Sequence, residues 1–188
     1  MIQEQEILNY LLSWIDRGKP TSLQSMVEAV LQEVWHTFHK ISASKTGRYH
    51  PKESNYRPYG LINHTIRVLW LAKELCREEG LNADDTDEVL AAAILHDIGK
   101  IHYYNSGWGH IDHGKLGAQK LEEHNLPKTV VQMVECHMAH WEGKELTTIQ
   151  DRILAYADYL ASRKEVRIEG LKAFRKEEGA SNEGIWKR

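Results

Sequence analysis

His96 and Asp97 stand side by side at the end of a wholly apolar run, residues 89–95. A charged carboxylate in such surroundings is unfavourable unless a partner compensates for its lost hydration. A bound divalent cation is one such partner, because it pairs with the carboxylate and takes the lone pair of the imidazole. The alternative is an aspartate that caps the helix beside a hydrogen-bonded core histidine, and short motifs also arise by chance. The pair alone therefore leaves a metal site and a structural pair both open.

Two further polar residues lie within apolar helical patterns. His64 shares a helical face with apolar residues of the segment 61–75, and Asp158 lies inside the apolar segment 153–160. Helices that pack in a bundle can direct such side chains to one point. Nitrogen and oxygen donors without a thiolate suit manganese, iron, cobalt, nickel, magnesium or zinc. The residues predict a divalent metal site with the ligands His64, His96, Asp97 and Asp158.

Helices must position these side chains, because apolar residues recur at helical spacing and no long stretch alternates with period two. We therefore predict an all-α fold. The expected helices cover residues 7–15, 22–34 after a cap at Thr21 or Ser22, 61–80, 84–95 opened by Asp84 or Asp85, 113–124, 127–141 and 148–162. Gly99 is expected to cap the end of the apolar helix. The segments 41–60 and 101–111 are expected to be loops.

The domain organisation follows from the same pattern. We expect N-terminal helices over residues 1–40, a metal-binding helical core over 41–164 and a charged C-terminal tail over 165–188. A length of 188 residues fits one domain with a core of its own. The N-terminal helices are expected to pack on that core or to form the face of a homodimer.

The composition argues against several classes of protein. Hydrophobic residues make up 41% and charged residues 27%, which is ordinary for a globular protein and argues against disorder. A net charge of -3, with no strongly basic half, argues against a broad surface for duplex nucleic acid. The two cysteines, Cys76 and Cys136, form no Cys-x-x-Cys pair, which argues against a disulfide scaffold or a zinc finger. Neither a secretory signal nor a bilayer-spanning run is visible, so we expect a cytoplasmic protein without a membrane partner.

The ordered set of predicted ligands resembles the HD-domain superfamily of metal-dependent phosphohydrolases. The segment GLINHT at 60–65 is similar to the family's first-histidine segment, AILHDIGK at 93–100 to its naming motif, and YAD at 156–158 to its late aspartate segment. The resemblance covers roughly residues 49–164, and the ordered set is more specific than any single piece. It implies a single all-helical bundle and hydrolysis of phosphate monoesters or diesters, often of nucleotides.

The same resemblance implies further ligands and a second metal ion. His113 resembles the helix start that supplies an additional ligand in binuclear members, and His137 lies where those members place another. In binuclear relatives the aspartate of the His-Asp pair bridges the two ions, which gives that role to Asp97. Two adjacent histidines are common in the second region of such relatives, whereas here two residues separate His137 from His140. One or two divalent ions are therefore expected, and plain core or surface histidines are the alternative for His113 and His137.

Candidate catalytic and substrate-binding residues surround this set. Asp97 and Lys100 are the catalytic candidates; Lys100 would neutralise a phosphate oxygen or simply compensate the helix C-terminus. His140 is a helical neighbour of His137 and would face the same cleft, and Arg163, one turn after Asp158, is a phosphate-binding candidate. Cations that precede the first ligand are Lys45, Arg48, His50, Lys52 and Arg57. Aromatic residues that could stack a base are Tyr103, Tyr104, Trp108 and Trp141. Solvated charges and packed aromatic rings are the alternative for these loop residues.

The sequence thus predicts a metal-dependent phosphohydrolase that cleaves a phosphate monoester or diester, with a small nucleotide as substrate, through a metal-activated water. Other readings stay open. The segments GLxxHT and HDIGKI also resemble the HD domain of bacterial 3′-5′ exoribonucleases, which would act on single-stranded nucleic-acid ends. Some HD-type di-iron proteins are oxygenases, and some HD-like domains are non-catalytic signalling modules.

Overall fold

The computed structural model describes residues 2–15, 21–44, 47–48, 50–102, 112–171 and 173–174. The regular elements in these ranges are all helical, which confirms the all-α prediction. They are α1 (Ile2–Leu12), η1 (Ser13–Ile15), α2 (Ser22–Phe38), η2 (Lys52–Asn55), α3 (Gly60–Glu78), α4 (Ala83–Leu95), η3 (Ile98–Lys100), α6 (His113–Glu123), α7 (Lys128–Cys136), α8 (Ala139–Glu142) and α9 (Ile149–Ala161), where η marks a 3-10 helix.

The helices begin where polar side chains cap their free backbone N–H groups. Thr21 accepts a hydrogen bond from the backbone N of Gln24 at 3.0 Å, as its position predicted, and Thr148 caps α9 in the same way. α4 begins slightly earlier than predicted, because Asn82 provides the cap and Asp84 lies within the first turn. The helix predicted over 127–141 is divided into α7 and α8.

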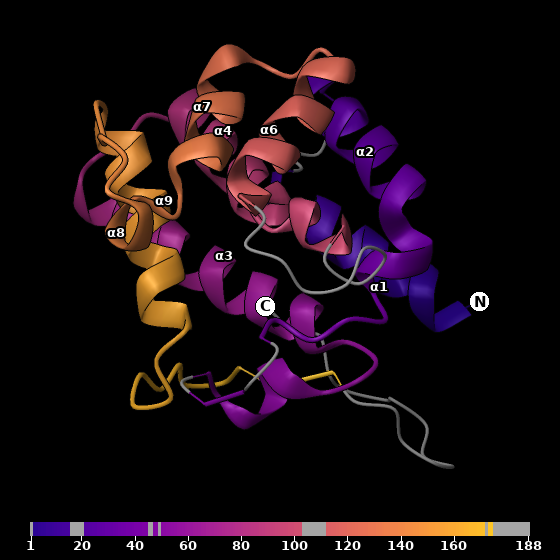
Figure 1. Ribbon diagram of the computed structural model, residues 1–188. Helices are drawn as coiled ribbons and strands as arrows, with labels where there is room; N and C mark the ends of the chain where they lie inside the picture. The colour runs from indigo at the N-terminus through magenta and orange to yellow at the C-terminus, as the bar shows by residue number, and fades with distance from the viewer. Residues whose placement is uncertain are drawn as a thin grey trace.

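α3 and α4 form the centre of the bundle (Figure 1). α3 packs against α9 and α4, and α4 also packs against α7, α2 and α9. Every residue of 89–95 in α4 is buried, as expected for a helix that is apolar on all sides. The polar groups at the C-terminal end of α4 therefore emerge inside the molecule.

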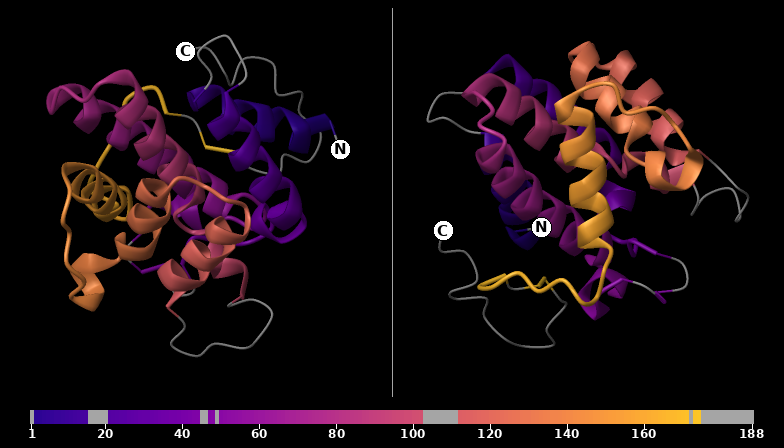
Figure 2. Two further views of the ribbon diagram at one scale, coloured as in Figure 1. Left: turned by 90° about the horizontal axis from the view of Figure 1, so that it is seen from above. Right: turned by 90° about the vertical axis from the view of Figure 1, so that its left-hand side faces the viewer.

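The N-terminal helices pack on this centre. Ile7, Leu11, Val27 and Leu31 belong to the same buried apolar cluster as Ile94. In the left view of Figure 2, α3 and α4 lie between α1 and α2 on one side and α9 on the other. The prediction of a helical bundle with N-terminal helices packed on it is confirmed.

Gly99 does not cap α4, because His96 is the C-cap and Gly99 lies within η3. A Cβ atom at Gly99 would overlap the carbonyl oxygen of His113 and lie 2.9 Å from the backbone N of Gly117. The residue is therefore small because η3 and α6 pack backbone to backbone, and the prediction of a C-cap glycine was wrong.

The chain that follows α9 runs back along α3. The guanidinium of Arg67 donates hydrogen bonds to the carbonyl of Ala161 at 3.1 Å and to that of Val166 at 2.7 Å. The side chain of Asn63 donates to the carbonyl of Phe174 at 2.8 Å and accepts from its backbone N at 2.6 Å. The described part of the predicted tail is thus fixed to α3, whereas residues 172 and 175–188 lie outside the described residues. Within the described ranges, no helix is both long and apolar enough to cross a membrane.

Candidate metal centre

Six buried side chains with metal-binding atoms come together between the helices. They form two groups, and in each group one nitrogen or oxygen atom per residue lies within 4.8 Å of the others. The first group, from α3, the end of α4 and α9, is His64, His96 and Asp158. The second group, from the start of η3, the start of α6 and the end of α7, is Asp97, His113 and His137. All six residues predicted as ligands therefore lie in these two groups.

Close packing of η3, α6 and α7 assembles the second group. Asp112 caps α6 by accepting a hydrogen bond from the backbone N of Lys115 at 2.9 Å, so the helix begins at His113. A Cβ atom at Gly114 would lie 2.8 Å from the carbonyl oxygen of Glu135 in α7. Small residues at these crossings let the backbones approach, and this places the first residue of α6 beside the last turn of α7.

The carboxylate of Asp97 faces both groups. One of its oxygens, Oδ2, lies 3.6 Å from Nε2 of His64 and 3.2 Å from Nε2 of His96. The other, Oδ1, lies 3.3 Å from Nε2 of His113 and 3.7 Å from Nε2 of His137. Each oxygen of Asp97 therefore lies beside the nitrogen donors of one group.

Backbone carbonyls fix the orientation of two imidazoles. Nδ1 of His96 lies 2.8 Å from the carbonyl oxygen of Ala93, and Nδ1 of His137 lies 2.7 Å from that of Val134. A carbonyl can only accept, so Nδ1 carries the proton and the lone pair of a neutral ring is on Nε2. In the neutral ring, Nε2 of His96 is buried without a hydrogen-bond donor to satisfy it, and its neighbour at 3.2 Å is the anionic Oδ2 of Asp97. An unsatisfied buried nitrogen is unfavourable, and a cation at this point would satisfy it.

The two carboxylates are ionised. Burial would raise the pKa of Asp97, but the charges of His96 and Lys100 hold it well below its usual range. Burial acts in the same direction on Asp158, and there a hydrogen bond from His64 and the nearby imidazole charges hold the pKa below its usual value. The site therefore offers two anionic side chains at neutral pH.

The imidazoles respond to burial and to these carboxylates. Burial lowers the pKa of His64 and of His113 by more than the neighbouring carboxylates raise it. For His96 burial also acts downward, but Asp97 and Asp158 outweigh it and the pKa rises. A proton on His96 takes the place of part of the positive charge that a metal ion would supply, so cation binding displaces it.

Lys100 reaches the predicted site. Its Nζ lies 2.6 Å from Oδ2 of Asp97 and donates to the carbonyl of Ala43 at 3.0 Å. The ammonium group is partly exposed, so it can contact both the carboxylate and a ligand that approaches from solvent. Its position suits the predicted contact with a phosphate oxygen, which stays a prediction.

Two of the five predicted cations of the 41–60 loop, His50 and Arg48, differ in position. The His50 ring lies 5.3 Å, centroid to centroid, from the His64 ring. Burial lowers the pKa of His50 to about 3, and the charges of His64 and Lys100 act in the same direction. His50 therefore borders the first group as a neutral ring rather than as the expected cation. Arg48 is exposed, and its role in substrate binding stays a prediction.

His140 and Arg163 belong to an aromatic cluster next to α9. The His140 ring lies 4.8 Å from the ring of Tyr159 and 5.1 Å from that of Trp141, beside a cavity of about 580 Å³. The guanidinium carbon of Arg163 lies 4.2 Å from the centre of the Tyr159 ring and 5.6 Å from that of Trp141. Nε of Arg163 is buried without a hydrogen-bond partner, and Trp141 is 58% exposed. The sequence analysis missed Tyr159, although it follows Asp158 directly.

One further buried carboxylate, Asp151, is not part of the two ligand groups. Asp151 accepts hydrogen bonds from the backbone N of Thr147 and Thr148, and it forms a capping box at the start of α9 rather than part of the metal site. Four predicted substrate-binding residues lie outside the described residues: Lys45, Tyr103, Tyr104 and Trp108.

The chain is similar to several known proteins. Ribonuclease Y of Sulfurovum sp. (strain NBC37-1) is 32% identical over 116 residues, which cover 61% of this chain and 21% of that protein. The dihydroneopterin 2',3'-cyclic phosphate phosphodiesterase of Methanocaldococcus jannaschii is 28% identical over 141 residues, 68% of this chain and 57% of that protein. A solved structure of a predicted HD superfamily hydrolase from an uncultured Thermotogales bacterium has a TM-score of 0.46 and 24% identity, over 70% of this chain and 66% of that one.

The chain thus spans about a fifth of the ribonuclease Y relative and little more than half of the phosphodiesterase. The family model of the HD domain matches residues 61–163, more than half of the chain. That range contains all six side chains of the two groups. The chain belongs to the HD-domain superfamily of metal-dependent phosphohydrolases.

Proposed function

We propose that this protein hydrolyses a phosphate diester or monoester of a small nucleotide-like molecule at a site for two divalent ions. One observation carries the proposal: the buried carboxylate of Asp97 faces a group of nitrogen and oxygen donors with each of its two oxygens. Structural ion pairs alone do not require four imidazoles round two buried carboxylates. The ligands in the proposal are His64, His96, Asp97, His113, His137 and Asp158.

Divalent ions at this site would draw charge from the phosphoryl oxygens and make a water molecule nucleophilic near neutral pH. The protein's own residues supply the arrangement. The carbonyls of Ala93 and Val134 hold the rings of His96 and His137 in the tautomer whose lone pair faces the site. Lys100, in contact with Asp97, is placed to neutralise a phosphate oxygen as charge develops on it.

The aromatic cluster supports a substrate with a flat ring. Trp141 and Tyr159 offer ring faces beside Arg163, whose buried Nε has no partner of its own. A heteroaromatic base could stack on these rings and accept a hydrogen bond from Arg163. The relative from Methanocaldococcus jannaschii is named for a cyclic phosphate of dihydroneopterin, a substrate that joins a flat heterocycle to a phosphodiester. His140 would complete this base-binding surface, and His50 would line the opposite side of the ligand groups.

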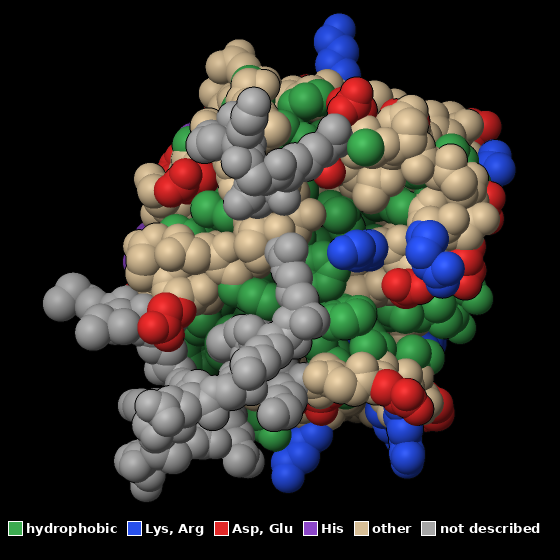
Figure 3. Space-filling model, turned by 180° about the vertical axis from the view of Figure 1, so that it is seen from behind, with side chains coloured by type: hydrophobic (Ala, Val, Ile, Leu, Met, Phe, Trp, Pro, Cys, Tyr) green, Lys and Arg blue, Asp and Glu red, His purple; other side chains and the backbone are tan. Residues whose placement is uncertain are grey.

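A second candidate is cleavage of single-stranded RNA, because several relatives are ribonucleases Y. The charge distribution favours the small substrate. The net charge is -3, and on the face drawn in Figure 3 the Lys and Arg side chains are scattered among Asp and Glu rather than gathered in a band. The other two alternatives are an HD-type di-iron oxygenase and a non-catalytic signalling module, and no observation on the described residues favours either of them.

The test is a hydrolysis panel with added manganese that contains nucleoside 2',3'-cyclic phosphates, nucleotides, a cyclic dinucleotide and short single-stranded RNA. Asp97→Asn keeps the shape of the side chain and removes its charge, and exposed Glu122→Gln is the matched control. We expect activity on a cyclic phosphate that falls by at least about a hundredfold in Asp97→Asn and in chelator, and is unchanged in Glu122→Gln.

The outcomes separate the candidates. Activity on RNA alone would replace the small substrate with the nuclease. The oxygenase would be favoured if no substrate of the panel were hydrolysed although manganese is bound, and if the iron-loaded protein consumed oxygen. Failure to bind any divalent ion would overturn the enzymatic proposal altogether.

A further inference from the structure

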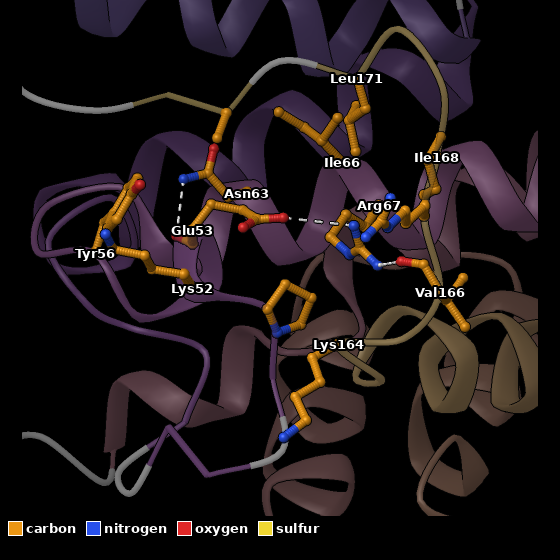
Figure 4. A pocket seen from close by; sticks show the side chains of 13 residues that line it. Lys52, Glu53, Tyr56, Asn63, Ile66, Arg67, Lys164, Val166, Ile168 and Leu171 are labelled. Atoms are coloured by element: carbon orange, nitrogen blue, oxygen red, sulfur yellow. Dashed lines mark hydrogen bonds and ion pairs between the residues drawn. The ribbon is translucent and has the colours of Figure 1, made fainter.

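A second cavity is bordered by η2 and by α3, the helix that carries His64. It has a volume of about 480 Å³, within the range of small-molecule sites, and three segments far apart in the sequence surround it. These segments are residues 51–53 and 56 around η2, residues 63, 66 and 67 of α3, and residues 164, 166–168, 171 and 173 after α9. Figure 4 shows the side chains that line it, with Arg67 beside Glu53 and Val166.

The described lining is strongly cationic. Its basic residues are Lys52, Arg67, Lys164 and Arg167, and its one acidic residue is Glu53. Lys52, Lys164 and Arg167 are exposed, and none of them has an ion-pair or hydrogen-bond partner among the described residues. Three positive charges of this kind around one hollow repel each other unless an anion lies between them.

A buried arginine forms one wall of the cavity. Arg67 is 4% exposed, and the carbonyls of Ala161 and Val166 hold its guanidinium in a fixed direction. Its contact with Glu53 is long, 3.5 Å, as the dashed line in Figure 4 indicates. Glu53 is itself partly exposed, so it offsets at most one of the four cations. The cavity therefore combines a preorganised guanidinium with flexible cations at its rim.

The cavity and the metal centre are neighbours. Asn63 lines the cavity, whereas the next residue, His64, belongs to the first ligand group. Pro51 lines the cavity, whereas the ring of the preceding residue, His50, lies 5.3 Å from that of His64. None of the six residues of the two ligand groups is among the described residues that line the cavity.

We propose that this cavity binds an anion with two or more negative charges, a phosphate-bearing group, separately from the metal centre. Tyr56 and the carbon chains of Ile66 and Ile168 add an apolar wall beside the cations. The anion has two possible sources. One source is a second phosphate of the molecule that is hydrolysed, and with this source the inference rests on the proposed function. The other source is a separate phosphorylated effector, and with this source the inference is independent of the proposed function.

The first experiment measures binding of inorganic pyrophosphate to the metal-free protein by isothermal titration calorimetry. Without metal the ligand groups lack the divalent ions that would hold the anion, and a charge-reversal variant of the cavity then shows whether the remaining binding belongs to it. The test variant is Lys164→Glu/Arg167→Glu, and its matched control, with the same change in net charge, is Lys40→Glu/Lys128→Glu, both exposed lysines outside the cavity lining. Circular dichroism checks that each variant is folded.

We expect the wild-type protein to bind pyrophosphate, with an affinity that falls as salt increases. In Lys164→Glu/Arg167→Glu the dissociation constant should rise by about tenfold or more, because two attractive charges become repulsive. In the control it should stay within about twofold, since distant exposed charges are largely screened. The proposal would be overturned if the wild-type protein did not bind pyrophosphate, or if Lys164→Glu/Arg167→Glu bound it equally well. Either result is independent of whether the proposed catalytic activity exists.

Kinetics then identify the source of the anion. If it is a second phosphate of the substrate, Lys164→Glu/Arg167→Glu raises KM for substrates with an additional phosphate and leaves turnover of p-nitrophenyl phosphate unchanged. If it is an effector, pyrophosphate alters turnover of p-nitrophenyl phosphate by the wild-type protein and not by this variant. Binding that affects neither reaction would contradict a role of the cavity in this enzyme.

Discussion

Replacement of Gly99 by alanine tests whether backbone packing sets the geometry of the metal centre. The added Cβ would overlap the carbonyl oxygen of His113 and lie 2.9 Å from the backbone N of Gly117. These are backbone atoms, which cannot rotate aside as a side chain can, so η3 and α6 must move apart. Asp97 precedes η3 and His113 begins α6. The same movement therefore separates Oδ1 of Asp97 from Nε2 of His113, now 3.3 Å apart.

The expected size of the effect follows from the overlap. Overpacking a tight contact costs about 1–3 kcal/mol, and more where backbone is involved. In a chain of this size each 1 kcal/mol lowers the melting temperature by about 2–4 °C, so Gly99→Ala should lower it by about 2–12 °C. Manganese affinity should fall as well, since a ligand of the second group is displaced. Circular dichroism gives the melting temperature, and calorimetric titration gives the affinity.

Gly80→Ala is the control for Gly99→Ala, because it strains the backbone at a position away from the metal centre. Gly80 has φ +66° and no atom within 4 Å of a Cβ atom, so alanine there strains the backbone by about 1 kcal/mol without a collision. Its manganese affinity should equal that of the wild type. The reasoning is refuted if Gly99→Ala melts within about 1 °C of the wild type, or if it binds manganese as tightly as Gly80→Ala.

Three further outcomes are expected. Manganese at a hundred times its dissociation constant should stabilise the metal-free protein by about 2.7 kcal/mol, and this gain, measured as a melting shift, should be absent in Asp97→Asn. Burial raises the pKa of Asp151, but hydrogen bonds from Thr148, Gln132 and Thr147 outweigh it, so the folded pKa is depressed. The ionised form therefore stabilises the fold above the unfolded pKa of about 3.9, and this stability is lost as pH falls through the folded pKa. Urea unfolding of wild type and Asp151→Asn should differ by about 1 kcal/mol at pH 7 and converge in acid; an unchanged difference contradicts the capping role. Asn63→Ala should cost about 1–3 kcal/mol in urea, and hydrogen exchange at the amide of residue 174 should accelerate, because two hydrogen bonds to that backbone are lost.

Helical periodicity and caps made most of the fold predictable. The apolar run 89–95 indicated a central helix, and Thr21 and Thr148 marked where two others begin. The division between α7 and α8 could not be predicted, since residues 127–141 contain no glycine and no internal proline. The sequence shows a glycine at position 99 but not why a glycine is needed there. The reason is the close approach of the α6 backbone, which only the packing of distant segments reveals.

The candidate site was predictable to a different extent for different residues. Buried polar side chains within apolar patterns indicated His64, His96, Asp97 and Asp158 before any resemblance was considered. His113 carries no such local signal, because α6 is polar along much of its length, and it entered through the family resemblance alone. The division of the ligands into two groups round Asp97, and the cationic cavity, depend on side chains from separate segments and leave no periodic signal in the chain.

The pairing of Asn63 with Phe174 has a consequence for how the molecule is made. The two residues are 111 positions apart, and Asn63 stands next to the first histidine of the metal centre. On the ribosome, α3 and the carbonyl of Glu53 that also accepts from Asn63 are complete long before residue 174 is synthesised. The pairing of Asn63 with Phe174 therefore forms late in synthesis, after every predicted ligand up to Asp158 has been added. Among the described residues, the helix that carries His64 thus receives its last side-chain contact from the chain only after the predicted ligand set is complete.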